Sequence, residues 1–241
     1  MRRPEPLPSI ADVRAQLAES GITHVGVTSA DILAETRAEL FRRRSAGLHG
    51  DMEFTYRDPE RSTDPLRAVR GARSIIVAAK PYLTDDDPLP PGEPAGPHAR
   101  VGRYAWIDHY APLRVALRDV AKRIRRADHR AVAFADDNSI VDRAVAHRAG
   151  LGWYGKNANL LLPGAGSWFV LGSIITTAEY EPAPEPATDG CGSCVRCIDA
   201  CPTGAIVGPG VIDANRCISW ILQKPGSIPE PYRSVIGDRI Y

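Results

Sequence analysis

Four of the five cysteines in this chain lie in one short run, and this run constrains the fold more than any other feature. It reads C-x2-C-x2-C-x3-C-P, with Cys191, Cys194, Cys197 and Cys201 followed by Pro202. The short intervals wrap three thiolates around one [4Fe–4S] cluster, and the longer last interval directs the fourth thiolate away, as in two-cluster ferredoxins. A structural zinc site is the alternative, but zinc knuckles usually pair two distant C-x2-C halves. The run therefore predicts iron–sulfur ligation.

The number of cysteines sets a limit on how the ligands are shared. Two clusters held only by cysteine need eight thiolates, and this chain contains five cysteines. We assign Cys191, Cys194 and Cys197 to one cluster, and Cys201 and Cys217 to a second. Three ligands are then missing, and the sequence stops abruptly at GDRIY. We therefore expect a fragment, or an incomplete version, of a longer protein.

The composition is that of an ordinary soluble globular chain. The 241 residues are 44% apolar and 24% charged, with a formal net charge of +1. This overall charge indicates no nucleic-acid partner, although a local basic face can be hidden in a balanced total. The N-terminus lacks a secretory signal, and the best apolar run, WFVLGSII, is too short to cross a bilayer. Clustered cysteines without an export signal favour metal ligation in a reducing cytoplasm, and we expect a monomer without membrane association.

Strands alternate with helices through residue 177, which indicates an α/β or α+β domain. Apolar periodicity predicts a helix capped by Ser9, a second helix capped by Ser29, and further helices over 109–127 and 137–149. Residues 47–65 are expected to form a long loop that can include a turn of helix, and the proline-rich segment 85–97 is expected to form a surface loop. Strands are expected over 23–28, 73–82, 129–135 and 167–177.

Several stretches resemble the epoxyqueuosine reductase family. They are RYAWIDHY (103–110), DDNSIVDRAVAHRAGLGWYGKN (136–157), GSWFVLGSIITT (166–177), the cysteine run and RCISWILQ (216–223). The resemblance implies an α+β protein, with a three-layer α/β cobalamin-binding domain over 1–180, a linker over 181–190 and an incomplete ferredoxin-like domain over 191–241. It also implies reduction of epoxyqueuosine to queuosine at the tRNA wobble position, with cobalamin fed by two [4Fe–4S] clusters and an external low-potential electron donor.

Asp136 is the candidate acid for this reaction. Removing an epoxide oxygen takes two electrons and at least one proton, and the resemblance implies a proton-donating aspartate at this position. Because Asp136 follows a predicted strand, its side chain is expected at the strand's C-terminal end, where desolvation beneath the corrin ring would raise its pKa. From sequence alone, an ordinary helix N-cap is the alternative, with Asp137 as the better capper and solvent-facing. We interpret Asp142 as structural.

The resemblance also implies a set of cofactor contacts. Arg143 would lie two helical turns from Asp136 and face the same site, with a surface arginine as the alternative. The glycine-rich segment 149–157 would bring backbone close to a ligand, with a plain loop as the alternative. His109 either takes the role of the family histidine or yields it to Tyr110 through a shift in register. The full set implied is Arg61, Asp136, Arg143, Lys156, Asn157, Leu160, Leu171 and Ser219.

The candidates for tRNA contact are Lys224, Arg233 and the arginine-rich helix 114–126, for which a solvated face is the alternative. Two other functions remain open. One is a reductive dehalogenase-like enzyme, which also joins cobalamin to two clusters, but Arg2-Arg3 lacks the apolar segment of the export signal typical of that class. The other is a non-enzymatic, ferredoxin-type electron carrier fused to a small-molecule-binding domain.

Overall fold

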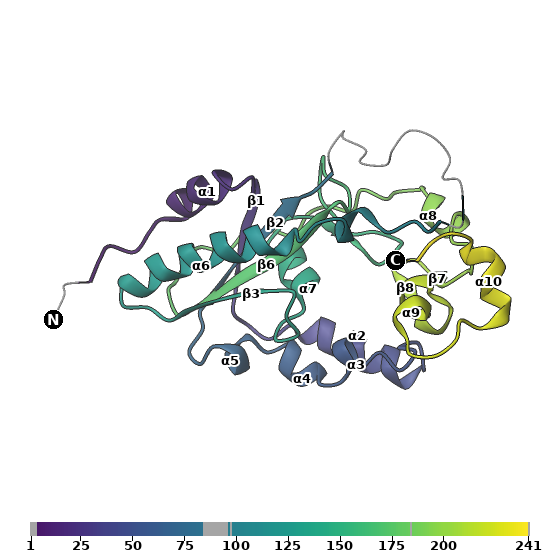
Figure 1. The fold of residues 1–241 in the computed structure, drawn as a ribbon. Helices are drawn as coiled ribbons and strands as arrows, with labels where there is room; N and C mark the ends of the chain where they lie inside the picture. The colour runs from purple at the N-terminus through teal and green to yellow at the C-terminus, as the bar shows by residue number, and fades with distance from the viewer. Residues whose placement is uncertain (1–3, 84–95, 97, 184, 241) are drawn as a thin grey trace.

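The structure is a computed structural model that describes residues 4–83, 96, 98–183 and 185–240. Its centre is a four-stranded sheet with the order β1-β2-β6-β3, in which every neighbouring pair is antiparallel. The strands correspond to the four apolar segments expected from the sequence (Figure 1). They are β1 (His24–Ser29), β2 (Ser74–Pro81), β3 (Ala131–Ala135) and β6 (Phe169–Thr176).

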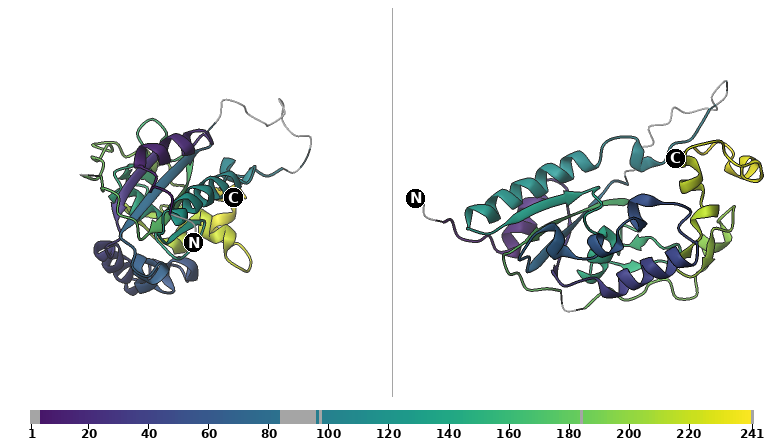
Figure 2. Two further views of the ribbon diagram at one scale, coloured as in Figure 1. Left: turned by 90° about the vertical axis from the view of Figure 1, so that its left-hand side faces the viewer. Right: turned by 90° about the horizontal axis from the view of Figure 1, so that it is seen from below.

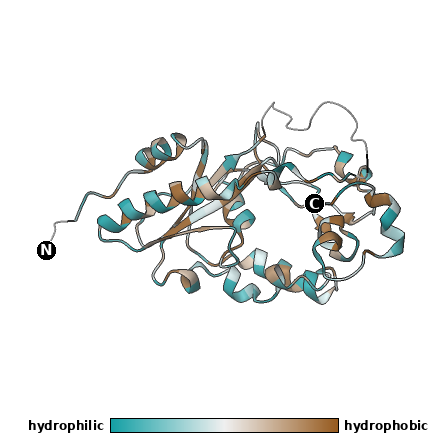
Figure 3. Ribbon diagram, viewed as in Figure 1, coloured by the Kyte–Doolittle hydropathy of each residue, from teal (hydrophilic) through white to brown (hydrophobic). Residues whose placement is uncertain are grey.

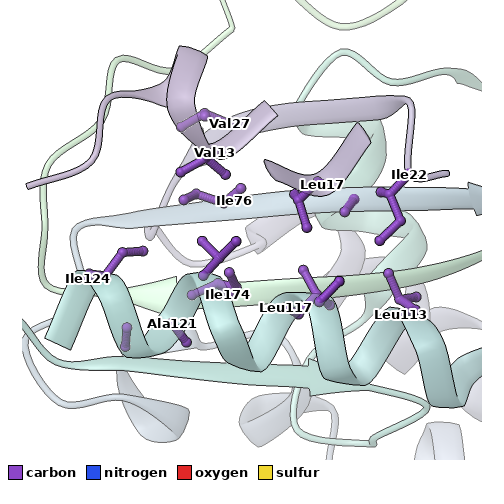
Figure 4. Packing of buried hydrophobic residues seen from close by; sticks show 14 of the residues in the cluster. Val13, Leu17, Ile22, Val27, Ile76, Leu113, Leu117, Ala121, Ile124 and Ile174 are labelled. Carbon is purple, nitrogen blue, oxygen red and sulfur yellow. The ribbon is translucent and has the colours of Figure 1, made fainter. Parts of the chain in front are cut away.

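One face of the sheet is covered by α1 (Ile10–Ala18) and α6 (Tyr110–Arg126). Buried α6 side chains recur at helical spacing, among them Leu113, Leu117 and Ile124, and pack against Ile76 and Ile174 of the strands (Figure 4). Ser9 caps α1 as expected, in a reciprocal capping box with Asp12. The side chains between these helices and the sheet form one of the two apolar cores, which Figure 4 shows.

The opposite face is covered by α7 (Asp142–Arg148) and by the segment that leads into α2 (Ala34–Ser45). Adjacent residues of β2 serve the two cores in turn, because Ile75 and Val77 point to this face and Ile76 to the other. Helices therefore lie on both sides of one sheet, which Figure 2 shows from two directions. This arrangement agrees with the predicted three-layer α+β class.

One helix prediction and one loop prediction need correction in the first 70 residues. α2 begins at Ala34, with Leu33 as an N-cap that makes no side-chain bond, because the Ser29 hydroxyl donates instead to Asp31. The expected loop over 47–65 contains short helices, where Asp58 and Asp64 each cap a helix whose first residue is proline. These helices are α3 (Glu53–Tyr56), α4 (Pro59–Ser62) and α5 (Pro65–Ala68).

The remaining elements are short and lie mostly at the end of the sheet opposite the N-terminus (Figure 1). Most of the predicted loop over 85–97 lies outside the described residues. In the described part of the chain, no helix has the length and apolar character needed to cross a membrane, and hydrophilic residues are interspersed along the helices (Figure 3). The short elements are η1 (Arg103–Ala105), β4 (Trp153–Tyr154), β5 (Leu160–Leu161), α8 (Arg196–Asp199), β7 (Ile206–Gly208), β8 (Val211–Ile212), η2 (Ala214–Arg216), α9 (Ile218–Gln223) and α10 (Glu230–Ile236).

Candidate active site

A pocket of about 600 Å³ opens at one edge of the sheet. The antiparallel register brings the ends of β2 and β3 to this edge together with the start of β6, where Pro81 pairs with Phe169 and Ala135 with Gly172. The volume lies in the range typical of small-molecule sites. The lining comprises Phe54, Ser62, Tyr82, Tyr104, Tyr110, Asp136, Asp137, Asn138, Ile140, Val141, Asp142, Arg143, Asn159, Leu160, Ser167, Phe169 and Leu171.

The loop after β3 supplies the acidic side of the pocket. Asp136 turns the chain with a left-handed φ of 55°, and the Asp137 carboxylate accepts a bond from the Ser139 amide at 2.7 Å. α7 consequently begins only at Asp142, with Val141 as an N-cap that lacks a side-chain bond. The predicted helix over 137–149 therefore starts five residues late, and neither Asp136 nor Asp137 caps it. Asp137 is exposed, as expected.

Asp142, the first residue of α7, has a perturbed carboxyl. Its Oδ1 atom is buried and has no hydrogen-bond partner among the described residues, although the residue as a whole is partly exposed. The pKa of Asp142 is raised to about 8, chiefly by burial and also by the negative charges of Asp137 and Asp136, while the Arg143 cation opposes the shift. The sequence interpretation of Asp142 as structural thus overlooked a carboxyl that lines the pocket.

Tyrosines form the wall opposite the acidic loop. Burial raises the pKa of Tyr110 to about 12, helped by the nearby charges of Asp136 and Asp142. His109 instead stacks on the Tyr82 ring, with centroids 4.8 Å apart. Of the two residues left open by the sequence, Tyr110 lines the pocket, whereas His109 belongs to the packing behind it. Tyr82 was missed, although its position directly after a strand that ends at this edge could have indicated it.

The predicted cofactor residues divide into two groups. Asp136, Arg143, Leu160 and Leu171 line the pocket. The expected two helical turns between Asp136 and Arg143 are absent, since the loop bridges them instead. The Arg143 guanidinium donates to the Ala158 carbonyl at 2.9 Å, which holds the side chain beside the pocket.

The other four predicted contacts lie outside the pocket lining. The Lys156 ammonium donates to the Gly192 carbonyl at 2.7 Å, and the Asn157 side-chain oxygen accepts from the Asn159 amide at 3.1 Å. Arg61 is exposed on α4, and Ser219 is exposed on α9. Lys156 therefore joins the glycine-rich segment to the cysteine run.

The glycines of segment 149–157 serve a close backbone packing. A Cβ atom on Gly152 would lie 2.1 Å from the Leu161 carbonyl oxygen, and one on Gly155 would lie 2.8 Å from a Leu161 methyl carbon. Glycine is required here because the two short strands β4 and β5 are pressed together. This hairpin places Leu160 on the pocket wall.

The cysteine run surrounds α8, and all five cysteines of the chain are free thiols. Burial raises the pKa of the Cys201 thiol, but bonds to its sulfur from the Ala205 amide (3.2 Å) and Thr203 outweigh this effect, so the net pKa is lowered. A thiolate supported by such hydrogen bonds suits cluster ligation. Within the described residues, no three His, Cys, Asp or Glu side chains are gathered as ligands of a single metal ion.

The cysteine-containing segment 190–240 packs against the residues that precede α3. The Ala214 amide donates to the Leu48 carbonyl at 2.9 Å, and the Trp220 indole donates to the Gly50 carbonyl. The segment is thereby held next to the helices that line the pocket (Figure 1).

The basic residues proposed for tRNA contact largely bond within the chain. Lys224 lies 3.3 Å from the Asp51 carboxylate, and Arg233 donates to the Ile228 carbonyl. On α6, Lys122 pairs with Asp119 at 2.7 Å, and the Arg125 guanidinium donates to a backbone carbonyl. These contacts favour the solvated-face interpretation for α6 and leave the tRNA role of Lys224 and Arg233 a prediction.

Comparisons with known proteins agree with this geometry. A family model described as a 4Fe-4S double cluster binding domain matches residues 190–241, which confirms iron–sulfur rather than zinc ligation as the interpretation of the cysteine run. The epoxyqueuosine reductase of Gloeobacter violaceus is 38% identical over 229 residues, which cover 92% of this chain and 69% of that protein. This chain belongs to the epoxyqueuosine reductase family.

Other members of the epoxyqueuosine reductase family match at similar levels. The Xanthomonas campestris protein is 36% identical over 248 residues, covering 100% of this chain and 69% of the relative. The Bacillus anthracis protein is 35% identical over 233 residues, covering 95% and 60%. The chain thus spans about 60% of the length of that curated relative.

Solved epoxyqueuosine reductases share the fold. One, crystallised with an epoxyqueuosine-modified tRNA-Tyr stem loop, superposes with a TM-score of 0.90 at 32% identity, covering 96% of this chain and 62% of the other. Another, from Bacillus subtilis, was solved with an aspartate-bearing catalytic loop swung out of the active site; its TM-score is 0.87 at 32% identity, with the same coverage. These matches confirm the predicted family and fold class.

Proposed function

We propose that the protein carrying this chain reduces epoxyqueuosine to queuosine in tRNA. The observation that carries the proposal is a pocket lined by Asp136 and Asp142 in a chain that belongs to this family and also carries the cysteine run. Relatives across most of the chain bear this name, and one solved relative was crystallised with an epoxyqueuosine-modified stem loop. A tRNA substrate also supports the cytoplasm as the place of reaction.

Asp136 is the proposed proton donor. Its carboxyl lines the pocket at the end of β3, where it would deliver a proton to the epoxide oxygen as the ring opens. The Bacillus subtilis relative supports this role, because the loop that swings out of its active site is described as catalytic and carries an aspartate. The left-handed backbone at Asp136 likewise marks a loop held in an unusual conformation.

Cobalamin is the proposed cofactor of the pocket. The residues present fit such a ligand, because Leu160, Leu171 and Phe169 give an apolar wall, while the buried Ser62 hydroxyl lacks a partner among the described residues. Leu160, Leu171, Asp136 and Arg143 would hold it. When bound, cobalamin would supply a cobalt centre able to carry electrons to the substrate. Arg61, Lys156, Asn157 and Ser219 stay predictions as further contacts.

Two [4Fe–4S] clusters are the proposed electron supply, loaded one electron at a time by an external low-potential donor. Cys191, Cys194 and Cys197 would bind one cluster, and Cys201 and Cys217 the other. Two all-cysteine clusters take eight thiolates, so the five cysteines leave three ligand positions unassigned. The match to a double-cluster domain supports two clusters, and the division of the cysteines between them stays a prediction.

The experiment uses the complete protein, loaded with iron–sulfur clusters and cobalamin. It is incubated with epoxyqueuosine-containing tRNA and a low-potential reductant, and the tRNA nucleosides are identified by mass spectrometry. We expect queuosine to accumulate, and its absence from a fully loaded preparation would refute the proposal. An Asp136→Asn variant should bind cobalamin, seen by its visible absorbance, but form at least about a hundredfold less queuosine per unit time.

A further inference from the structure

The Asp142 carboxyl occupies a position that an ionised carboxylate rarely tolerates. Its Oδ1 atom is buried in the pocket wall without a hydrogen-bond partner among the described residues. A buried charge is costly unless it is paired, and an unpaired buried acceptor adds to that cost. A protonated carboxyl avoids the charge and offers an O–H donor toward the pocket. The geometry by itself therefore favours the neutral acid.

The charges around Asp142 also favour its neutral, protonated form. The carboxylates of Asp137 and Asp136 on the preceding loop raise the pKa of Asp142, and the cation of Arg143, the next residue along α7, lowers it. When Asp136 carries the proton that it donates, burial and the Asp137 charge still favour the neutral form of Asp142. The Arg143 guanidinium is bonded to the Ala158 carbonyl, which limits its pairing with the carboxylate. The net result is a pKa of about 8 for Asp142, so that most molecules hold this proton at neutral pH.

Two groups of α6, Tyr110 and Arg114, also lie in this part of the molecule. The partly buried Tyr110 lines the same pocket and stays protonated, since its pKa is raised to about 12. The Arg114 guanidinium lies over the Tyr110 ring at 5.7 Å and also reaches the exposed Asp108 carboxylate at 4.0 Å. Arg114 is therefore engaged with other partners, and it is not among the groups that shift the pKa of Asp142.

The chemistry needs a second proton. Conversion of an epoxide to an alkene and water consumes two electrons and two protons. The first C–O bond opens as the oxygen takes one proton, and the second C–O bond breaks as the same oxygen leaves as water. Both electrons come from the low-potential donor through the iron–sulfur clusters. Asp136 delivers a single proton before it must be reloaded.

We propose that Asp142 holds the second proton of the reaction within the pocket and gives it to the departing oxygen. This inference rests on the proposed function. It assigns different tasks to the two acids, with Asp136 exposed on the loop after β3 and Asp142 in the first turn of α7. A proton stored inside the wall is available even when the substrate closes the pocket to bulk water.

The kinetic test uses the loaded, complete protein with three variants. Asp142→Asn keeps the shape but has no acidic proton, and Asp142→Glu restores one. Asp128→Asn is the matched control, since Asp128 is exposed, lies past the end of α6 and has a left-handed φ of 64° that Asn tolerates. We expect at least about a tenfold lower rate for Asp142→Asn, partial recovery for Asp142→Glu and no change for Asp128→Asn. A rate for Asp142→Asn within about twofold of the wild type, with the same pH profile, would overturn the proposal.

An infrared titration tests the stored proton without any substrate. At neutral pH the wild-type protein should show the C=O absorption of a buried carboxylic acid, which fades as the pH rises past about 8 and is missing from Asp142→Asn. Absence of this band from the wild type at neutral pH would overturn the proposal. If the wild type forms no queuosine yet shows the band, the proposed function fails while the protonation of Asp142 stands.

Discussion

The indole ring of Trp220 meets the phenyl ring of Phe54 edge-on, with the ring centroids 5.9 Å apart. Phe54 lines the pocket, whereas Trp220 lies in α9, three residues after Cys217. A single aromatic contact thus joins the wall of the candidate active site to a helix that begins at a proposed cluster ligand. The indole N–H adds a bond to the Gly50 carbonyl.

Replacing Trp220 should weaken this junction. We expect Trp220→Ala to lower the free energy of unfolding by about 2–4 kcal/mol, because it removes a partly buried ring and leaves a cavity. Trp220→Phe keeps a ring against Phe54 but loses the bond to Gly50, and should cost about 1 kcal/mol. Urea denaturation measures both values. Equal losses in the two variants would show that the hydrogen bond, not the ring contact, holds the junction.

Asp142 should make stability depend on pH. An unfolded aspartate releases its proton near pH 4, whereas folded Asp142 keeps it until about pH 8, so the folded state binds the extra proton between these values. Stability from this group therefore falls as the pH rises through that window. Asp142→Asn removes this pH dependence. At about pH 8 its free energy of unfolding, measured by urea denaturation, should exceed that of the wild type by a few kcal/mol, whereas near pH 4 there should be no such gain. A difference that is constant with pH would contradict this expectation.

The division of the cysteines between two clusters predicts how double substitutions combine. Cys194→Ser and Cys197→Ser should disrupt the same cluster, so that the double variant loses no more iron than either single one. Cys194→Ser combined with Cys217→Ser should lose iron from both clusters. Iron analysis and electron paramagnetic resonance of the reduced proteins measure the outcome. Additive iron loss from Cys194→Ser and Cys197→Ser would place these cysteines on different clusters.

The β4–β5 hairpin should not tolerate a side chain at Gly152. Because an added Cβ would lie 2.1 Å from the Leu161 carbonyl oxygen, we expect Gly152→Ala to cost about 3 kcal/mol or more of unfolding free energy. Gly164→Ala is the control, as its Cβ would meet open space and only its left-handed φ of 75° is unfavourable, at about 1 kcal/mol. Thermal denaturation of the two variants gives the comparison, and similar costs would refute the packing argument.

Periodicity in the sequence predicted the parts of the fold that bury one continuous apolar face. α6 begins and ends within one residue of its expected range of 109–127, and both central strands were found. The start of α7 could not be read in this way, because the left-handed turn at Asp136 and the bond accepted by Asp137 compete locally with helix formation. The spacing of apolar residues therefore does not predict where this helix begins.

The residues of the candidate site could be predicted only where sequence spacing or the family resemblance indicated them. Asp136 and Arg143 were found, and both line the pocket. Tyr82 and Phe54 come from distant segments, which only the folded sheet and the contacts of α3 bring together. Asp142 differs from an ordinary acid at a helix start through its buried oxygen, which has no hydrogen-bond partner among the described residues, and through the charges around it. Both properties depend on the three-dimensional packing.

The positive φ of Asp136 determines which substitutions can be interpreted there. Aspartate and asparagine adopt the left-handed region more readily than other residues with a side chain, whereas alanine pays about 1 kcal/mol or more in the same conformation. An alanine variant would therefore alter the path of the loop as well as remove the acid, and its lost activity would have two explanations. Asparagine keeps the turn and removes only the proton, so it isolates the chemistry of this position.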